Sequence, residues 1–164
     1  GKCPVGMAYP YGAFNDEVVT LLSSLGFQYA RTVWSSHNFD VQTDLLRFRP
    51  TCHHDDEKLF ELAEEFLAME TEEPKIFYIW GHSYEFDNDN NWELIEEVCS
   101  KLAGKDNIWY ATNIEIYDYV QAYKSLRYSA DGHKIYNPTL LTIWIDAGSK
   151  LYSIQPGETI CIDF

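Results

Sequence analysis

The apolar residues of this chain fall into short runs that alternate with stretches of helical periodicity over residues 5–126. Short runs bounded by Gly, Pro or Asn are typical of strands, whereas apolar residues three and four apart are typical of amphipathic helices. The runs predict strands over 5–9, 27–33, 45–49, 76–80 and 108–111. Helices are expected after Asn15, Asp55 or Asp56, Asn91 and Thr112, because these residue types cap helix N-termini.

This alternation predicts a parallel α/β sheet, either open or part of a barrel. The run over 76–80 is continuously apolar, which favours a strand buried on both faces. After Arg127 the pattern changes to short alternating strands over 135–136, 140–145, 150–154 and 159–162, and Asp131-Gly132 is a two-residue hairpin signal. We therefore expect an α/β body over 1–126 and a small antiparallel β extension over 127–164 packed on it.

Charge and composition narrow the possible partners. The chain has 164 residues, with 12 Lys and Arg against 26 Asp and Glu, so its net charge is −14. This charge disfavours nucleic acids and anionic membranes, and no run of about 18 apolar residues predicts a transmembrane helix. Aromatic residues make up 16% of the chain, which is enough ring surface to build a core and argues against disorder.

The four cysteines are far apart in the sequence, at Cys3, Cys52, Cys99 and Cys161, and no CxxC pair occurs. We expect them to be reduced and buried, although two disulfides remain possible in an exported protein. The first residues, 1–4, contain no apolar signal-peptide core. The sequence thus predicts a cytoplasmic protein, unless the native N-terminus lies further upstream.

Residues with chemical potential follow three of the expected strands, where parallel α/β proteins place their sites. The segments are 9–12 (Tyr-Pro-Tyr-Gly), 47–56 with Cys52-His53-His54-Asp55-Asp56, and 80–87 with His82. A histidine directly after a buried strand is a plausible general acid or base, because imidazole titrates near neutrality. Glu85 and Asp87 lie close enough in the sequence to hold its imidazolium charge.

Each segment also has a purely structural interpretation. Pro-Tyr-Gly is a common turn, and His82 could be a buried structural histidine. The residues 52–56 have the composition of a metal cluster, but adjacent residues seldom point at one ion and an aspartate there is expected to cap a helix. The tyrosines over 110–128 fit packing better than a sugar platform.

The combination of motifs resembles the polysaccharide deacetylase family, carbohydrate esterase family four. The resemblance rests on Met7-Ala8-Tyr9-Pro10-Tyr11-Gly12, followed by a helix and then Gly26-Phe27-Gln28-Tyr29-Ala30-Arg31-Thr32. The segment 79–86 looks like the family's late Leu-x-His motif with Trp80 at the Leu position, and 91–119 looks like its last helix-strand-helix. The resemblance covers about residues 4–126 and leaves out the C-terminal sheet.

The resemblance implies a distorted (β/α) barrel, here a partial one, that removes N-acetyl or O-acetyl groups from a sugar. In the family, an Asp and two His hold a divalent metal, often zinc, and a second Asp acts as base. Carried over to this sequence, His82 is the general acid and the Tyr11 backbone N–H helps to hold the oxyanion. Substrate contacts are expected from Tyr9, Pro10, Arg31, Arg49, His53, His54, Trp80 and Tyr84.

The sequence departs from the family pattern in two respects. The opening Asp-Asp and His-x-x-x-His motifs are absent, so we expect no metal ligands within this chain and no activity from the chain alone. The Arg that opens the third motif is Ala8, which leaves its role to Arg31 or Arg49.

The missing part would also leave a sheet edge open, so a second copy or the missing N-terminal half is the expected protein partner. The resemblance implies an acetylated carbohydrate as the ligand. Two other functions remain open, a carbohydrate-binding or assembly module without catalysis, and a small metalloprotein that uses Cys52, His53, His54 and His82.

Overall fold

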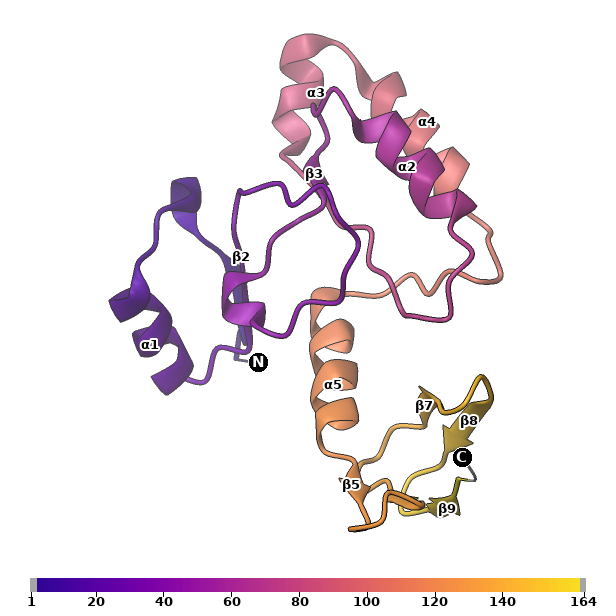
Figure 1. Ribbon diagram of the computed structural model, residues 1–164. Helices are drawn as coiled ribbons and strands as arrows, with labels where there is room; N and C mark the ends of the chain where they lie inside the picture. Colours follow the sequence, from indigo (N-terminus) through magenta and orange to yellow (C-terminus); the bar gives the residue numbers. More distant parts are fainter. Residues whose placement is uncertain (1–2, 163–164) are drawn as a thin grey trace. The chain divides into compact units, whose positions relative to one another are not determined.

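The computed structural model describes residues 3–162 and divides into two compact units (Figure 1), one ending at Tyr110 and the other beginning at Ala111. The division falls earlier than the sequence-based boundary at 126, because helix α5 (Asn113–Lys124) contacts strand β7 (Ile143–Asp146) of the second unit. Helices and strands both contribute, so the mixed α/β class is confirmed. Gly1 and Lys2, which entered the prediction of the compartment, lie outside the described residues.

The strands of the first unit form two parallel pairs. They are β1 (Gly6–Ala8), β2 (Tyr29–Arg31), β3 (Cys52–His53) and β4 (Ile79–Trp80). β1 pairs with β2 and β3 pairs with β4. The segment that leads into β3 runs beside β2, because the Phe48 N–H donates to the Ala30 carbonyl at 3.0 Å and Phe48 forms a parallel bridge with Arg31. The strands expected over 5–9, 27–33 and 76–80 are therefore present in shorter form.

The expected helices form close to their capping residues. They are α1 (Asp16–Ser24), α2 (Leu59–Ala68) and α4 (Trp92–Leu102), together with α3 (Ser83–Asp89), which the periodicity did not indicate. Asn15 caps α1 by accepting from the Val18 N–H at 2.9 Å. The Asp cap expected for α2 stands one turn earlier, where Asp56 accepts from the Lys58 N–H at 3.0 Å.

Two of the expected strands are wrong. Leu45–Arg47 is a 3₁₀ helix, η2, because Leu45 and Phe48 are buried three residues apart, the spacing of one 3₁₀ turn rather than of a strand. Residues 108–111 form no strand. The Tyr110 hydroxyl instead donates to the Leu102 carbonyl at 2.8 Å and accepts from the Lys105 N–H at 2.9 Å, which closes the end of α4.

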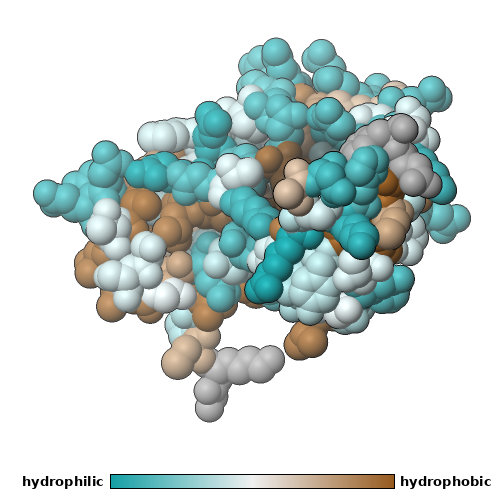
Figure 2. Space-filling view, turned by 60° about the horizontal axis from the view of Figure 1, so that its bottom comes forward, coloured by the Kyte–Doolittle hydropathy of each residue, from teal (hydrophilic) through white to brown (hydrophobic). Residues whose placement is uncertain are grey.

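The hydrophobic core of the first unit consists of two clusters. One includes Tyr9, Val19, Leu22 and Ala30, and the other Phe39, Cys52, Leu59, Leu62 and Val98. The run over 76–80 is half-buried, not buried on both faces, because β4 pairs only with β3 among the described strands. Apolar side chains also reach the surface among the polar ones (Figure 2). Exposed leucines include Leu21 in α1 and Leu25 directly after it.

The second unit is built on antiparallel strands, as the sequence predicts. A three-stranded sheet has the order β5 (Arg127–Tyr128), β6 (Lys134–Tyr136), β9 (Thr159–Cys161), and β7 pairs with β8 (Leu151–Ile154). The Gly132 N–H donates to the Ser129 carbonyl at 2.9 Å, so the Asp131-Gly132 turn is present within a loop longer than two residues. Thr112 and Glu115 form a capping box that begins α5.

All four cysteines are free thiols in this structure, and burial is confirmed only for Cys52. Burial raises the pKa of the Cys52 thiol to about 12, so it stays protonated at neutral pH. Cys3, Cys99 and Cys161 are exposed. No helix among residues 3–162 is long and apolar enough to cross a bilayer.

Candidate functional site

The carboxyl ends of three neighbouring parallel strands bring polar and aromatic side chains together in the first unit. Arg31 ends β2, His53 ends β3 and Trp80 ends β4. The Arg31 guanidinium carbon lies 4.2 Å from the centroid of the Trp80 ring, and the His53 ring meets the same indole edge-on at 4.5 Å. Parallel strands place their carboxyl ends at one edge, so this gathering follows directly from the topology.

Glu85 lies at the centre of this group because of how helix α3 begins. His82 is the N-cap residue of α3, and Glu85 at the third helical position reaches back so that its Oε2 accepts from the His82 N–H at 2.8 Å. The same oxygen accepts a hydrogen bond from Nε2 of His54 at 2.8 Å. His53 Nε2 lies 3.4 Å from it and His82 Nδ1 lies 3.3 Å from it. Three imidazoles therefore converge on one carboxylate oxygen.

The carboxylate is held in its charged form. Partial burial by itself would raise the pKa of Glu85, but hydrogen bonds from His54 and from the His82 N–H outweigh that effect, and the charge of His53 adds to them. The pKa of Glu85 falls to about 2 as a result. Burial next to His54 lowers the pKa of His53, so its imidazole loses its proton more readily than usual.

Aromatic rings pack closely around these groups. The His53 and His54 rings are 4.2 Å apart, and His54 packs on Phe86 at 4.3 Å. The His82 ring lies 5.9 Å from Trp80 and 5.2 Å from Tyr84. Burial lowers the pKa of Arg31, although a guanidinium remains charged at any physiological pH. The cluster thus combines ring faces with one cation and one anion.

Two buried polar atoms of this cluster have no hydrogen-bond partner. They are Nδ1 of His54 and Nε1 of Trp80, and only one other such side-chain atom, Oδ1 of Asn91, occurs in residues 3–162. Native proteins satisfy the great majority of buried polar groups, so an orphan calls for an explanation. Both atoms lie within the cluster around the charged Glu85 carboxylate, so the fold itself does not satisfy this cluster completely.

Gly81 is required for the close approach of β4 to His54. A Cβ placed on Gly81 would overlap Cδ2 of the His54 ring. The His54 N–H also donates to the Trp80 carbonyl at 2.9 Å, which holds the two strand ends together. Any residue larger than glycine would therefore displace the buried histidine that orients Glu85.

The structure gathers five of the predicted site residues into this one cluster, and Tyr84 lies at its exposed rim. The five are Arg31, His53, His54, Trp80 and His82. Arg49 is not among them. It is exposed, and its backbone N–H and carbonyl pair with the Gln42 side chain at 2.9 Å and 2.7 Å.

The predicted residues that follow β1 have different surroundings. Tyr9 is only 3% exposed, its hydroxyl donates to the Leu46 carbonyl at 2.7 Å, and its ring stacks on Phe14 at 4.5 Å. Its phenol is thus committed to packing, whereas substrate binding was expected of it. Pro10 and Tyr11 lie in the 3₁₀ turn η1 (Pro10–Gly12), where Tyr11 is fully exposed with a positive φ of 55°.

Segment 52–56 is not gathered around one point. The Cys52 thiol is buried and protonated, Asp55 is exposed, and Oδ2 of Asp56 accepts from Nε2 of His37 at 2.7 Å. This segment therefore does not supply the Asp-His-His set that the family resemblance implies.

The sequence indicated Glu85 as a charge partner of His82, and the structure places the two side chains 3.3 Å apart. The sequence did not indicate the hydrogen bond of Glu85 to His54. The available signal was the Glu three residues after His82, a spacing that favours a capping box. Asp87, the other carboxylate considered beside His82, accepts instead from the Trp92 indole N–H at 2.9 Å.

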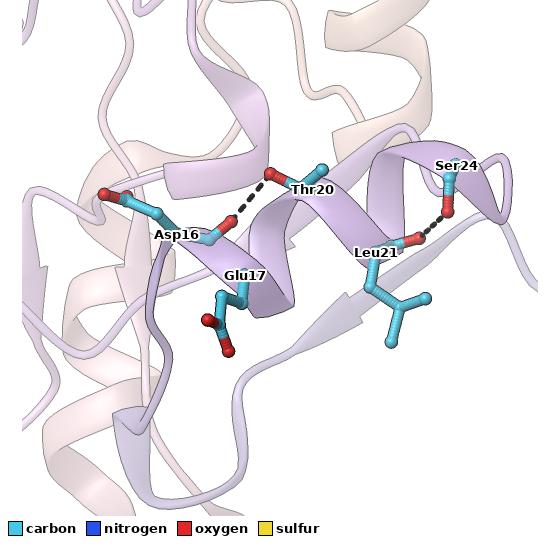
Figure 3. Close-up of a pocket in the computed structure, with 5 residues that line it drawn as sticks. All are labelled: Asp16, Glu17, Thr20, Leu21 and Ser24. Carbon is cyan, nitrogen blue, oxygen red and sulfur yellow. Dashed lines mark hydrogen bonds between the residues drawn. The ribbon is translucent and has the colours of Figure 1, made fainter.

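A shallow depression on α1 offers no comparable chemistry (Figure 3). It is lined by Asp16, Glu17, Thr20, Leu21 and Ser24, all on one exposed face of the helix. The Thr20 hydroxyl donates to the Asp16 carbonyl at 2.8 Å and the Ser24 hydroxyl to the Leu21 carbonyl at 2.7 Å. Both hydroxyls are thus bonded within their own helix.

Comparison with known proteins adds no assignment. No family model, no curated protein and no solved structure matches this chain.

Proposed function

We propose that this chain carries the proton-donating and sugar-binding part of a hydrolase of the polysaccharide deacetylase type. The observation that carries the proposal is the pairing of His82 with Glu85 at the carboxyl edge of parallel strands. The His82 side chain is 48% exposed, and its Nδ1 lies 3.3 Å from the Glu85 carboxylate. An exposed imidazole backed by a carboxylate is the arrangement that general acid catalysis uses.

The strand order of the first unit supports the barrel type that the resemblance implies. β1 pairs with β2 and β3 pairs with β4, and Phe48, in the segment that leads into β3, forms a parallel bridge with Arg31 of β2. Doubly wound sheets reverse the chain order of their strands at a switch point, whereas (β/α) barrels keep it. A consecutive parallel set is therefore what a segment of a barrel would contain.

The chemistry assigned to His82 is the delivery of one proton. When water adds to the acetyl carbonyl and the C–N or C–O bond breaks, the leaving amine or alkoxide needs a proton to depart as a neutral group. With Nδ1 facing Glu85, Nε2 of His82 is the ring nitrogen that can donate it. Glu85 stabilises the imidazolium before transfer and fixes the orientation of the ring.

The sugar itself would contact the aromatic side of the cluster. Tyr84 is 57% exposed and its ring lies 5.2 Å from the His82 ring. The Trp80 ring, on which Arg31 stacks, lies 5.9 Å from the His82 ring. The Trp80 Nε1 donor has no partner but is buried, so the exposed Tyr84 ring and the His82 imidazole are the groups that a sugar would contact. Ring faces with a few directed polar groups are typical of sites for small polar ligands.

The test is His82→Gln in the complete gene product, assayed for acetate release from acetylated chitooligosaccharides. We expect kcat to fall by about 10²–10⁴, the usual contribution of a general acid. An aryl acetate with a good leaving group needs no protonation and should lose far less.

The matched control is His37→Gln, because His37 is also an exposed imidazole, 41% exposed, paired with a carboxylate 2.7 Å away on Asp56. It should keep the parental rate. A folded His82→Gln protein that matches the parent on the oligosaccharide would overturn the proposal. Saccharide binding without any acetate release by the complete product would favour the carbohydrate-binding alternative instead.

A further inference from the structure

We infer that His53, His82 and Glu85 form a binding site for a divalent transition-metal ion of the zinc type. One donor atom from each of the three side chains lies within 4.8 Å of the other two. The inference concerns binding alone and does not rest on the proposed hydrolysis.

The separations within this group suit a tetrahedral ion. Oε2 of Glu85 lies 3.4 Å from Nε2 of His53 and 3.3 Å from Nδ1 of His82. Adjacent ligand atoms of a tetrahedral zinc ion, with bonds of about 2.0–2.1 Å, are about 3.3–3.4 Å apart. Charge-assisted hydrogen bonds are shorter, about 2.7–2.9 Å, so these two contacts fit the edges of a coordination tetrahedron better than strong ion pairs.

His54 holds the Glu85 carboxylate in place without being one of the three ligands. Its Nε2 donates to the Glu85 carboxylate at 2.8 Å, the distance of a true charge-assisted hydrogen bond, and its ring is buried. A hydrogen bond to a ligating carboxylate, made by a group outside the coordination sphere, fixes the carboxylate and tunes the metal. The His82 N–H bond fixes Glu85 from the helix side, so the carboxylate is oriented by the fold itself.

The donor set indicates the class of metal. Two imidazole nitrogens and one carboxylate oxygen are the ligands of hydrolytic zinc sites and of other borderline divalent ions. Mg²⁺ and Ca²⁺ prefer oxygen ligands, so they should bind weakly here. Three protein ligands also leave a coordination position open for water or a substrate oxygen.

Occupation of this site would compete with the role proposed for His82. A metal on Nδ1 takes the ring away from its Glu85 pairing and turns the general acid into a ligand. If both proposals hold, zinc inhibits proton donation. Zn²⁺ binding is measured without any turnover. A failure of the metal site and a failure of proton donation by His82 are therefore observed in different experiments.

The experiment is titration of this chain with Zn²⁺ by calorimetry and with Co²⁺ by visible absorption. It uses a background in which the exposed Cys3, Cys99 and Cys161 are serine, because free thiolates bind the same metals. We expect one equivalent of each ion, an intense Co²⁺ spectrum of tetrahedral type, and no comparable binding of Mg²⁺.

The variants His53→Gln and Glu85→Gln should each weaken Zn²⁺ binding by more than about tenfold. His37→Ala is the matched control, because it removes another carboxylate-paired imidazole and should leave the affinity unchanged. Circular dichroism verifies the fold of each variant, and Glu85→Gln keeps an oxygen for the His82 N–H. Absence of Zn²⁺ binding, or binding that both glutamine variants retain, would overturn the inference.

Discussion

Both units of the molecule contain a buried polar centre, and the two centres differ in how completely their hydrogen bonds are satisfied. In the second unit, Asn137 is fully buried and every polar atom of its side chain is used. Its Nδ2 donates to the carbonyls of Leu141 and Ile154 at 2.7 Å and 2.9 Å. Its Oδ1 accepts from the N–H and the hydroxyl of Thr139 at 2.9 Å and 2.7 Å.

The centre in the first unit is left open. Glu85 draws three histidines to one oxygen, but Nδ1 of the buried His54 and Nε1 of Trp80 have no partner. Around Asn137, each donor meets an acceptor of the same strands and loop, so nothing remains for a ligand. The comparison indicates that the Asn137 centre is satisfied by the fold alone, whereas the Glu85 centre keeps two buried polar atoms without a partner in the fold.

The largest effect that would test this contrast is expected from Asn137→Ala. The Ile154 carbonyl would lose this partner in a buried position, and the Leu141 carbonyl and the Thr139 N–H would lose it in partly buried positions. A buried polar group left without its partner costs about 1–3 kcal/mol. We expect the free energy of unfolding of the second unit to drop by about 3 kcal/mol or more.

Amide hydrogen exchange resolves the effect by unit. Protection should fall over β6 to β9, while the amides of β1 to β4 exchange as in the parent. A loss of protection of less than about 1 kcal/mol would mean that water replaces the amide and that the Asn137 centre is not closed.

The second effect, expected to be smaller, comes from Gly81→Ala. The added methyl group would overlap the His54 ring, and overpacking of this kind typically costs about 1–3 kcal/mol. The imidazole NMR signals of His54 and of its neighbours should shift together, because the ring that orients Glu85 must move.

Gly104→Ala provides the control for that variant. Its Cβ would meet nothing within 4 Å, so its cost arises from the positive φ of 67° alone. The expected loss is about 1 kcal/mol, with unchanged histidine signals. Equal histidine shifts in the two variants would show that Gly81 has no special relation to His54.

Sequence patterns predicted much of the frame of this cluster. The apolar runs placed strands ahead of His53 and His82, and the expected capping residues lie at or near the start of α1, α2, α4 and α5. Short-range signals of this kind depend on spacing along the chain. Helix α3 was not predicted because residues 83–89 lack an apolar stripe. The capping box of His82 and Glu85 begins this helix, and the burial of Phe86 stabilises it.

The centre of the site was beyond the reach of such patterns. The hydrogen bond between His54 and Glu85 joins residues 31 positions apart, and only the pairing of β3 with β4 brings them together. The same limit explains Tyr9, since its bond to the Leu46 carbonyl spans 37 positions and converts an expected substrate contact into a packing residue.

The third expected effect is a loss of folding stability at low pH. The pKa of Glu85 is lowered from 4.5 to about 2, so the folded state binds fewer protons than the unfolded state between these values. Its contribution to stability is complete above about pH 4.5 and is lost as the pH falls towards 2. The lowered pKa of His53 acts in the same direction at higher pH, because stability decreases once the pH falls below 6.5.

Urea unfolding from pH 7.5 to 3 separates these two contributions. His53→Gln should flatten the stability profile below pH 6.5, and Glu85→Gln should flatten it below pH 4.5. If either variant keeps the full slope of the parent in its own range, that group does not titrate as its surroundings suggest.

The smallest effect is expected from Tyr9→Phe, which removes one hydroxyl and keeps the ring that stacks on Phe14. The Leu46 carbonyl loses its 2.7 Å hydrogen bond, so the free energy of unfolding should fall by about 1 kcal/mol. Saccharide binding should not change, because this hydroxyl is already satisfied within the fold, as the Asn137 amide is.

Tyr84→Phe is the matched comparison on the open side of the same unit. Its ring is exposed beside His82, so stability should change by less than about 0.5 kcal/mol while any contact with a sugar is affected. If Tyr9→Phe instead weakened saccharide binding at constant stability, the end of β1 would belong to the ligand site after all. The open region would then extend from the histidine cluster to the Tyr-Pro-Tyr-Gly turn, as the family resemblance implies.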